Sequence, residues 1–121
     1  MPKAIITNFS QAEMMTRALD IARRADAGES IPETDYILNY LDPLDAYRAI
    51  TPERFVLLQT LQQLGAVRIQ QLAQELQRDY HAVQADITAL LTLDLIAQTP
   101  EGVAIPWDAV EWRLTTIAQA A

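Results

Sequence analysis

Between residues 51 and 92 the chain carries start and stop signals for three closely spaced helices, and this pattern limits its fold more than any other feature. Thr51-Pro52-Glu53 combines an N-cap threonine, a proline at the first helical position and an acid near the positive end of the helix dipole. Gly65 supplies a stop for this helix. Apolar residues at helical spacing predict a second helix over 69–76, and Asp79 is placed to cap a third. Three helices with tight connections are expected.

The segment after the third helix has the composition of a hairpin. Two short apolar stretches, 95–98 and 103–105, are separated by Thr99-Pro100-Glu101-Gly102, which is typical of a turn. Together with the three helices, this hairpin predicts a winged helix-turn-helix domain over residues 51–106, in which the hairpin is the wing. The overall class is mainly α with short β, that is, α+β.

The remaining segments predict a strand, a helix, a strand and a tail. Residues 3–7 favour a strand, Ser10 and Glu13 have capping-box spacing for a helix that ends near residue 27, and 36–41 favours a second strand. We expect this extension, residues 1–50, to serve in dimerisation or partner binding. The tail, 107–121, fits a helix through Val110, Leu114 and Ile117, or a strand through alternating Val110, Trp112 and Leu114, and we favour the helix. It is expected to pack on the core or on the dimer interface.

Composition excludes several classes of function. The chain has no cysteine, one histidine and three glycines, each explained as a helix stop or a turn, so we expect no metal, no cofactor and no catalytic site. The first nine residues lack the apolar length of a secretory signal, and no apolar run approaches the ~20 residues of a membrane span, which favours a cytoplasmic protein. The formal net charge of −7 opposes non-specific adhesion to nucleic acid.

The third helix, about 80–93, carries the candidate site. If Val83, Ile87 and Leu90 face the core, helical geometry places a polar set on the opposite face, where a recognition helix meets the major groove. His81 and Gln84 can bond base edges, and Arg78, Tyr80 and Thr88 can reach phosphate oxygens. The predicted DNA-binding residues are Arg78, Tyr80, His81, Gln84, Ala85 and Thr88.

The segment from Leu72 to Leu90, followed by Leu95-Ile96 and by Val103 to Asp108, resembles a family of small prokaryotic predicted transcriptional regulators with a MarR-like winged helix. The resemblance covers nearly the whole chain, including the helix start at Thr51. It implies sequence-specific binding to operator DNA as a homodimer, and in some members service as an autoregulating antitoxin with a toxin partner. The family usually has glycine in the turn before the recognition helix, whereas this chain has Gln77, which must then adopt a glycine-like conformation.

A second hypothesis is an acidic protein-interaction module on a winged-helix scaffold, with weak or no DNA binding. Residues 29–50 hold five acids against one arginine, Arg48, and this stretch suits a basic partner protein. Convergence of Arg68, Arg78 and Arg113 around the face of His81 would favour DNA instead.

Overall fold

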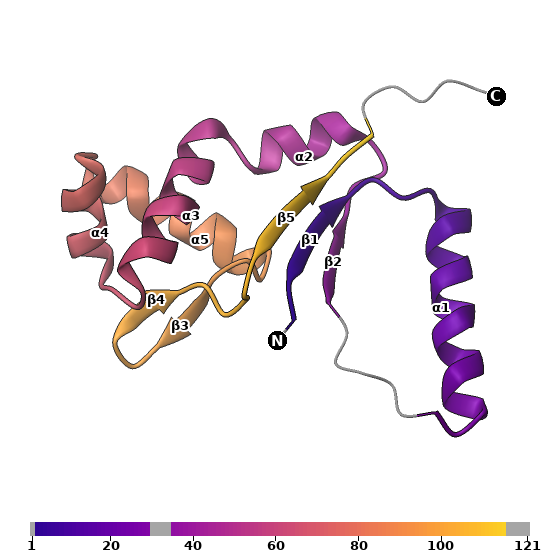
Figure 1. The fold of residues 1–121 in the computed structure, drawn as a ribbon. Helices are drawn as coiled ribbons and strands as arrows, with labels where there is room; N and C mark the ends of the chain where they lie inside the picture. The colour runs from indigo at the N-terminus through magenta and orange to yellow at the C-terminus, as the bar shows by residue number, and fades with distance from the viewer. Residues whose placement is uncertain (1, 30–34, 116–121) are drawn as a thin grey trace. The chain divides into compact units, whose positions relative to one another are not determined.

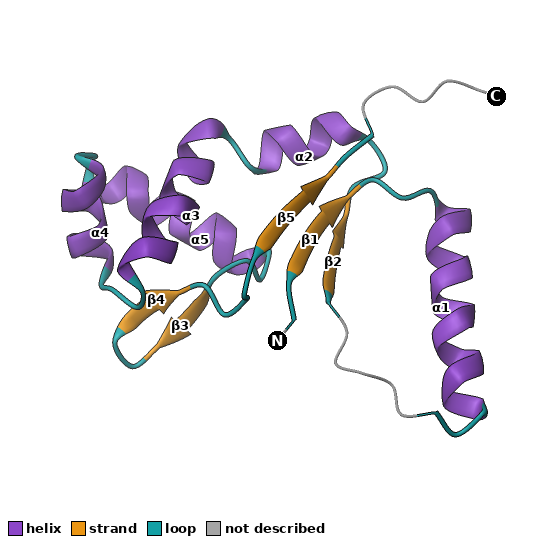
Figure 2. Cartoon of the chain, viewed as in Figure 1, coloured by secondary structure: helices purple, strands orange, loops and turns teal. Residues whose placement is uncertain are grey.

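A computed structural model of the chain describes residues 2–29 and 35–115, and it shows an α+β fold. The chain divides into two compact units (Figures 1 and 2). The strand unit comprises Met1–Ala46 and Ala109–Ala121, and the helical unit comprises Tyr47–Asp108. The helical unit is thus inserted in the chain between two strands of the strand unit.

The strand unit is built on a parallel three-stranded sheet. Its central strand, β1 (Ala4–Thr7), pairs on one side with β2 (Tyr36–Asn39) and on the other with β5 (Val110–Arg113). The register sets Ala4 against both Tyr36 and Val110. Every residue of β1 is buried, as expected for the middle strand of a parallel sheet.

The strand β5 corrects one prediction. We favoured a helix for the tail, but Val110–Arg113 is extended and pairs with β1. The alternation of Val110, Trp112 and Leu114 was the correct signal, and pairing with a strand more than a hundred residues earlier stabilises it. Ile117, which contributed to the predicted helix, lies outside the described residues.

Two contacts between polar side chains link neighbouring strands of this sheet. The ammonium group of Lys3 lies 2.8 Å from Glu111 on β5, and this pair raises the pKa of Lys3 and lowers that of Glu111. The buried hydroxyl of Thr7 donates to Asn39 Oδ1 on β2 at 2.8 Å. Side chains thus join Thr7 of β1 to β2, and Lys3, just before β1, to β5.

The helix α1 (Gln11–Asp26) follows β1, and its predicted boundaries are confirmed. Ser10 caps it by accepting from the backbone N–H of Glu13 at 3.1 Å, and Gly28 follows its end with a φ of 75°. No described residue of α1 is buried. None of the helices among the described residues is long and apolar enough to cross a membrane.

The helical unit contains the predicted succession of elements. After α2 (Pro43–Ala49), which leads into the unit, come α3 (Pro52–Leu64), α4 (Ile69–Leu76) and α5 (Tyr80–Thr92). An antiparallel hairpin of β3 (Ala97–Thr99) and β4 (Gly102–Ala104) completes it. Its core consists of Ile50, Leu57, Leu58, Leu61, Val67, Leu72, Ala73, Val83, Ile87, Leu90, Leu95, Ile96 and Val103.

Candidate functional site

The turn between α4 and α5 consists of Gln77, Arg78 and Asp79. Gln77 adopts the left-handed conformation, with φ 53° and ψ 44°, so the glycine-like geometry predicted from the sequence is confirmed. The Arg78 N–H donates back to Ala73 O at 3.1 Å, which satisfies a carbonyl near the end of α4. Asp79 caps α5 by accepting from the backbone N–H groups of His81 and Ala82. The turn therefore fixes the direction in which α5 leaves α4.

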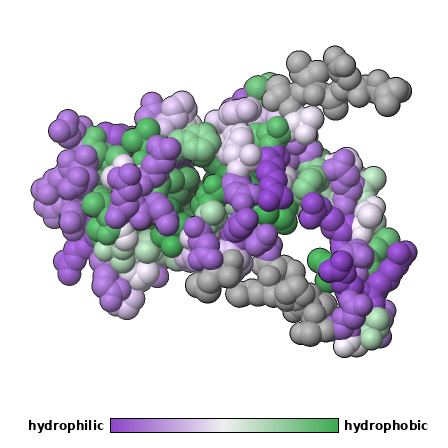
Figure 3. Space-filling model, in the orientation of Figure 1, coloured by the Kyte–Doolittle hydropathy of each residue, from purple (hydrophilic) through white to green (hydrophobic). Residues whose placement is uncertain are grey.

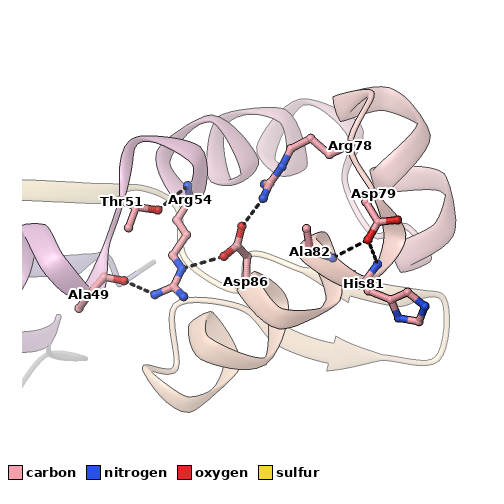
Figure 4. A network of polar contacts seen from close by, with 8 residues as sticks. All are labelled: Ala49, Thr51, Arg54, Arg78, Asp79, His81, Ala82 and Asp86. Carbon is pink, nitrogen blue, oxygen red and sulfur yellow. Dashed lines mark hydrogen bonds and ion pairs between the residues drawn. The ribbon is translucent and has the colours of Figure 1, made fainter.

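A carboxylate on α5 gathers two arginines from other parts of the unit (Figure 4). Asp86 accepts from Arg54 Nε on α3 at 3.0 Å and from Arg78 Nη2 in the turn at 2.9 Å. Arg54 also donates to the backbone carbonyl of Ala49. The Asp86 side chain is only 14% exposed, so this ion pair is largely shielded from water and links α3, the turn and α5.

This cluster changes the predicted site at Arg78. The sequence placed Arg78 among the phosphate-contacting residues, but its guanidinium group turns toward Asp86, away from His81 in Figure 4. Arg78 turns this way because the carboxylate of Asp86 is partly buried, and a buried negative charge is stable only when a positive group pairs with it. Asp86 is correspondingly absent from the exposed face, where its charge would have repelled phosphate.

The opposite face of α5 is exposed, as the spacing predicted. Val83, Ile87 and Leu90 are buried, and the side chains on the other side of the helix face solvent, namely His81, Gln84, Ala85 and Thr88. Tyr80, 41% exposed, stands edge-on to the His81 ring with centroids 5.7 Å apart. The structure therefore brings five of the six predicted residues together on one accessible helix face.

The hairpin is tied to the segment that begins α4. Val67 and Val103 form an isolated antiparallel bridge, with N···O distances of 2.8 and 3.1 Å in the two directions. Gly102 has a φ of 135°, and a Cβ there would collide with the Val67 carbonyl. Only glycine therefore permits this approach of the hairpin to the helices.

A hollow of about 590 Å³ lies between the hairpin and the starts of α4 and α5. It is lined by Arg68, Ile69, Gln70, Tyr80, Gln98, Gly102 and Val103. Arg68 precedes α4, and its side chain has no hydrogen bond or ion pair to any described residue. It is exposed, so it is a cation beside Tyr80 that remains available to a ligand.

Sequence reasoning missed the part that Arg54 plays, and it expected Arg68, Arg78 and Arg113 to converge around the face of His81 if the protein binds DNA. Arg54 stands in the first turn of α3, and only its long-range partner Asp86 distinguishes it from an ordinary surface arginine. Of these three arginines, Arg68 lines the hollow beside Tyr80, whereas Arg78 pairs with Asp86. Arg113 belongs to the strand unit and pairs with Glu111 at 2.6 Å.

The charges of the helical unit remain acidic on balance. Its basic residues are Arg48, Arg54, Arg68 and Arg78, against the acids Glu53, Glu75, Asp79, Asp86, Asp94, Glu101 and Asp108. Within the described part of the chain, no three histidine, aspartate or glutamate side chains gather in a way that could hold a metal ion.

The geometry thus defines an α+β protein in which a three-helix and hairpin unit presents one polar helix face. Residues 49–112, slightly more than half of the chain, match the HVO_A0114 family. The chain belongs to this family, and the match covers the helical unit almost entirely. No curated protein and no solved structure shows significant similarity to it.

Proposed function

We propose that the helical unit is a winged helix-turn-helix domain and that the protein is a small cytoplasmic DNA-binding regulator of transcription. The observation that carries this proposal is the exposed polar face of α5, which directly follows the capped turn from α4. A helix held in this way by its predecessor can lie in the major groove with its first turns against the bases. The hairpin joined to Val67 then serves as the wing.

In this proposal the residues of the face divide between base and phosphate contacts. Gln84 and His81 are the base readers, because a carboxamide and an imidazole both present donors and acceptors to base edges. Thr88 and Tyr80 offer hydroxyl groups to phosphate oxygens. Arg68, rather than Arg78, supplies the positive charge, because it lines the hollow beside Tyr80 and its side chain has no hydrogen bond or ion pair with a described residue.

Because few positive charges are available near the α5 face, we expect the affinity for DNA to depend only weakly on salt concentration. Because the slope of log K against log salt is about −0.9 for each phosphate neutralised, one phosphate neutralised by Arg68 in each protomer of a dimer predicts a slope of only about −2. Affinity must then rest on base contacts and on pairing of two half-sites, so we include a homodimer in the proposal. Repression of its own operon, with or without a toxin partner, is the regulatory role that we propose for such a dimer.

Fluorescence anisotropy with fragments of the protein's own upstream promoter tests this proposal. We expect sequence-specific binding with a shallow salt slope, and loss of that specificity in a His81→Ala, Gln84→Ala double variant. A Gln62→Ala, Gln63→Ala variant is the matched control, because both glutamines are exposed on a different helix, α3. An Arg68→Ala variant should bind all sequences more weakly and flatten the salt slope by about one for each protomer.

Two results would overturn the proposal. One is the absence of binding at low salt, which would make the acidic protein-interaction module the leading hypothesis. The other is binding that the α5 double variant and the α3 control variant weaken equally.

A further inference from the structure

The helix α1 carries an apolar stripe whose residues are exposed, apart from the half-buried Met14. Met14, Ala18, Ile21 and Ala25 recur at spacings of four, three and four, the repeat of a helix that packs against another helix. Ile21 is 43% exposed, and Met15 on the flank of the stripe is 62% exposed. Figure 3 shows green apolar atoms on the surface of α1 among purple polar ones.

We propose that α1 pairs with α1 of a second copy of this chain in the antiparallel orientation. This pairing would supply the dimer contact that the proposed function needs, yet it is tested without DNA, so that either proposal can fail alone. The inference rests on the order of large and small residues along the stripe and on the charges at the two ends of the helix.

The order of side chains fits an antiparallel pair. When the two helices run in opposite directions, Met14 faces Ala25 of the second copy and Ile21 faces its Ala18, so that each layer holds one large and one small residue. In a parallel pair Met14 would meet Met14 and Ala18 would meet Ala18, which crowds some layers and leaves gaps in others. Steric complementarity therefore selects the antiparallel orientation.

The end charges select the same orientation. Glu13 in the first turn of α1 and Arg24 in its last turn lie on the same flank of the stripe, and Arg24 also pairs with Asp20 within the helix. In an antiparallel pair the acidic end of each helix meets the basic end of the other, and the helix dipoles also oppose one another favourably. The helix as a whole balances three acids with three arginines, so a second copy meets no net repulsion at this surface although the chain carries −7.

The size of the contact sets the expected strength. A helix of 16 residues is about 24 Å long. One helix pair of that length buries less than the ~800 Å² per partner of a standard stable interface, so we expect a reversible dimer with a dissociation constant in the micromolar range.

Analytical ultracentrifugation of the full chain, without DNA and across about 1 to 200 μM, tests the surface. Ile21→Glu puts a charge into the stripe and should raise the dissociation constant at least about tenfold. Thr16→Glu is the matched control, because Thr16 lies on the opposite side of the same exposed helix and should leave the constant within about twofold. Circular dichroism should show both variants folded, since neither side chain is buried.

Engineered cysteines test the orientation, since the natural chain contains none. A Met14→Cys, Ala25→Cys double variant should form a disulfide-linked dimer on oxidation, whereas each single variant should not. The two positions within one helix are about 16 Å apart, too far for an internal disulfide. A monomer at all concentrations, a dimer that tolerates Ile21→Glu, or efficient cross-linking of Met14→Cys alone would each overturn the proposal.

Discussion

Replacing Asp86 by asparagine removes the negative charge that two arginines share in the helical unit. Asparagine has nearly the same shape, so the packing of α5 is unchanged while the charge is lost. Its oxygen can still accept from one guanidinium group, but its NH₂ group then faces the other. The variant therefore leaves at least one of Arg54 and Arg78 without its anionic partner in a partly buried site.

The expected loss of stability follows from the burial of the cluster. An exposed ion pair contributes up to about 1 kcal/mol, whereas breaking a fully buried one costs about 3 to 5 kcal/mol. The Asp86 side chain is 14% exposed, and those of Arg54 and Arg78 are 22% and 27% exposed. The cluster is therefore intermediate between an exposed and a fully buried ion pair. We expect the free energy of unfolding to fall by about 2 to 3 kcal/mol, or Tm by about 8 to 12 °C for a chain of this length.

Urea and thermal unfolding followed by circular dichroism measure this loss. Asp94→Asn is the matched control: it makes the same chemical change at an exposed residue with a φ of 59°, a conformation that asparagine tolerates well. It should change stability by less than about 0.5 kcal/mol. If Asp86→Asn also stays within about 0.5 kcal/mol of the natural chain, the argument that the cluster joins α3, the turn and α5 is refuted.

Two further substitutions test the backbone around the site. Gly102→Ala should destabilise the protein by about 3 kcal/mol or more in urea unfolding, because the new methyl group collides with the Val67 carbonyl; Gly28→Ala, at a positive φ but in open space, is its control and should cost only about 1 kcal/mol. Gln77→Gly should stabilise the protein by about 0.5 to 1 kcal/mol, because it relieves the left-handed strain at the end of α4. A Gly102→Ala variant as stable as Gly28→Ala, or a destabilised Gln77→Gly variant, would contradict these arguments.

Much of the helical unit could be predicted from the sequence because its signals are local. The caps at Thr51 and Asp79 depend on backbone N–H groups two or three residues away, and Gly65 ends α3 through its own conformation. The two faces of α5 followed from helical geometry once Val83 and Ile87 were assigned to the core. A short apolar segment on either side of a turn was likewise enough to predict the hairpin.

The sequence by itself therefore determined where the helices begin and end and which face of α5 is polar, since those features depend on neighbours a few residues apart. Only the tertiary structure decided that the tail is a strand, because its partner β1 lies at the other end of the chain. It also decided that Arg78 turns inward, because Asp86 attracts it together with Arg54, which is 32 residues from Asp86 in the sequence. An arginine side chain forms an ion pair with a carboxylate that lies close to it, and only the folded chain determines which carboxylate is close.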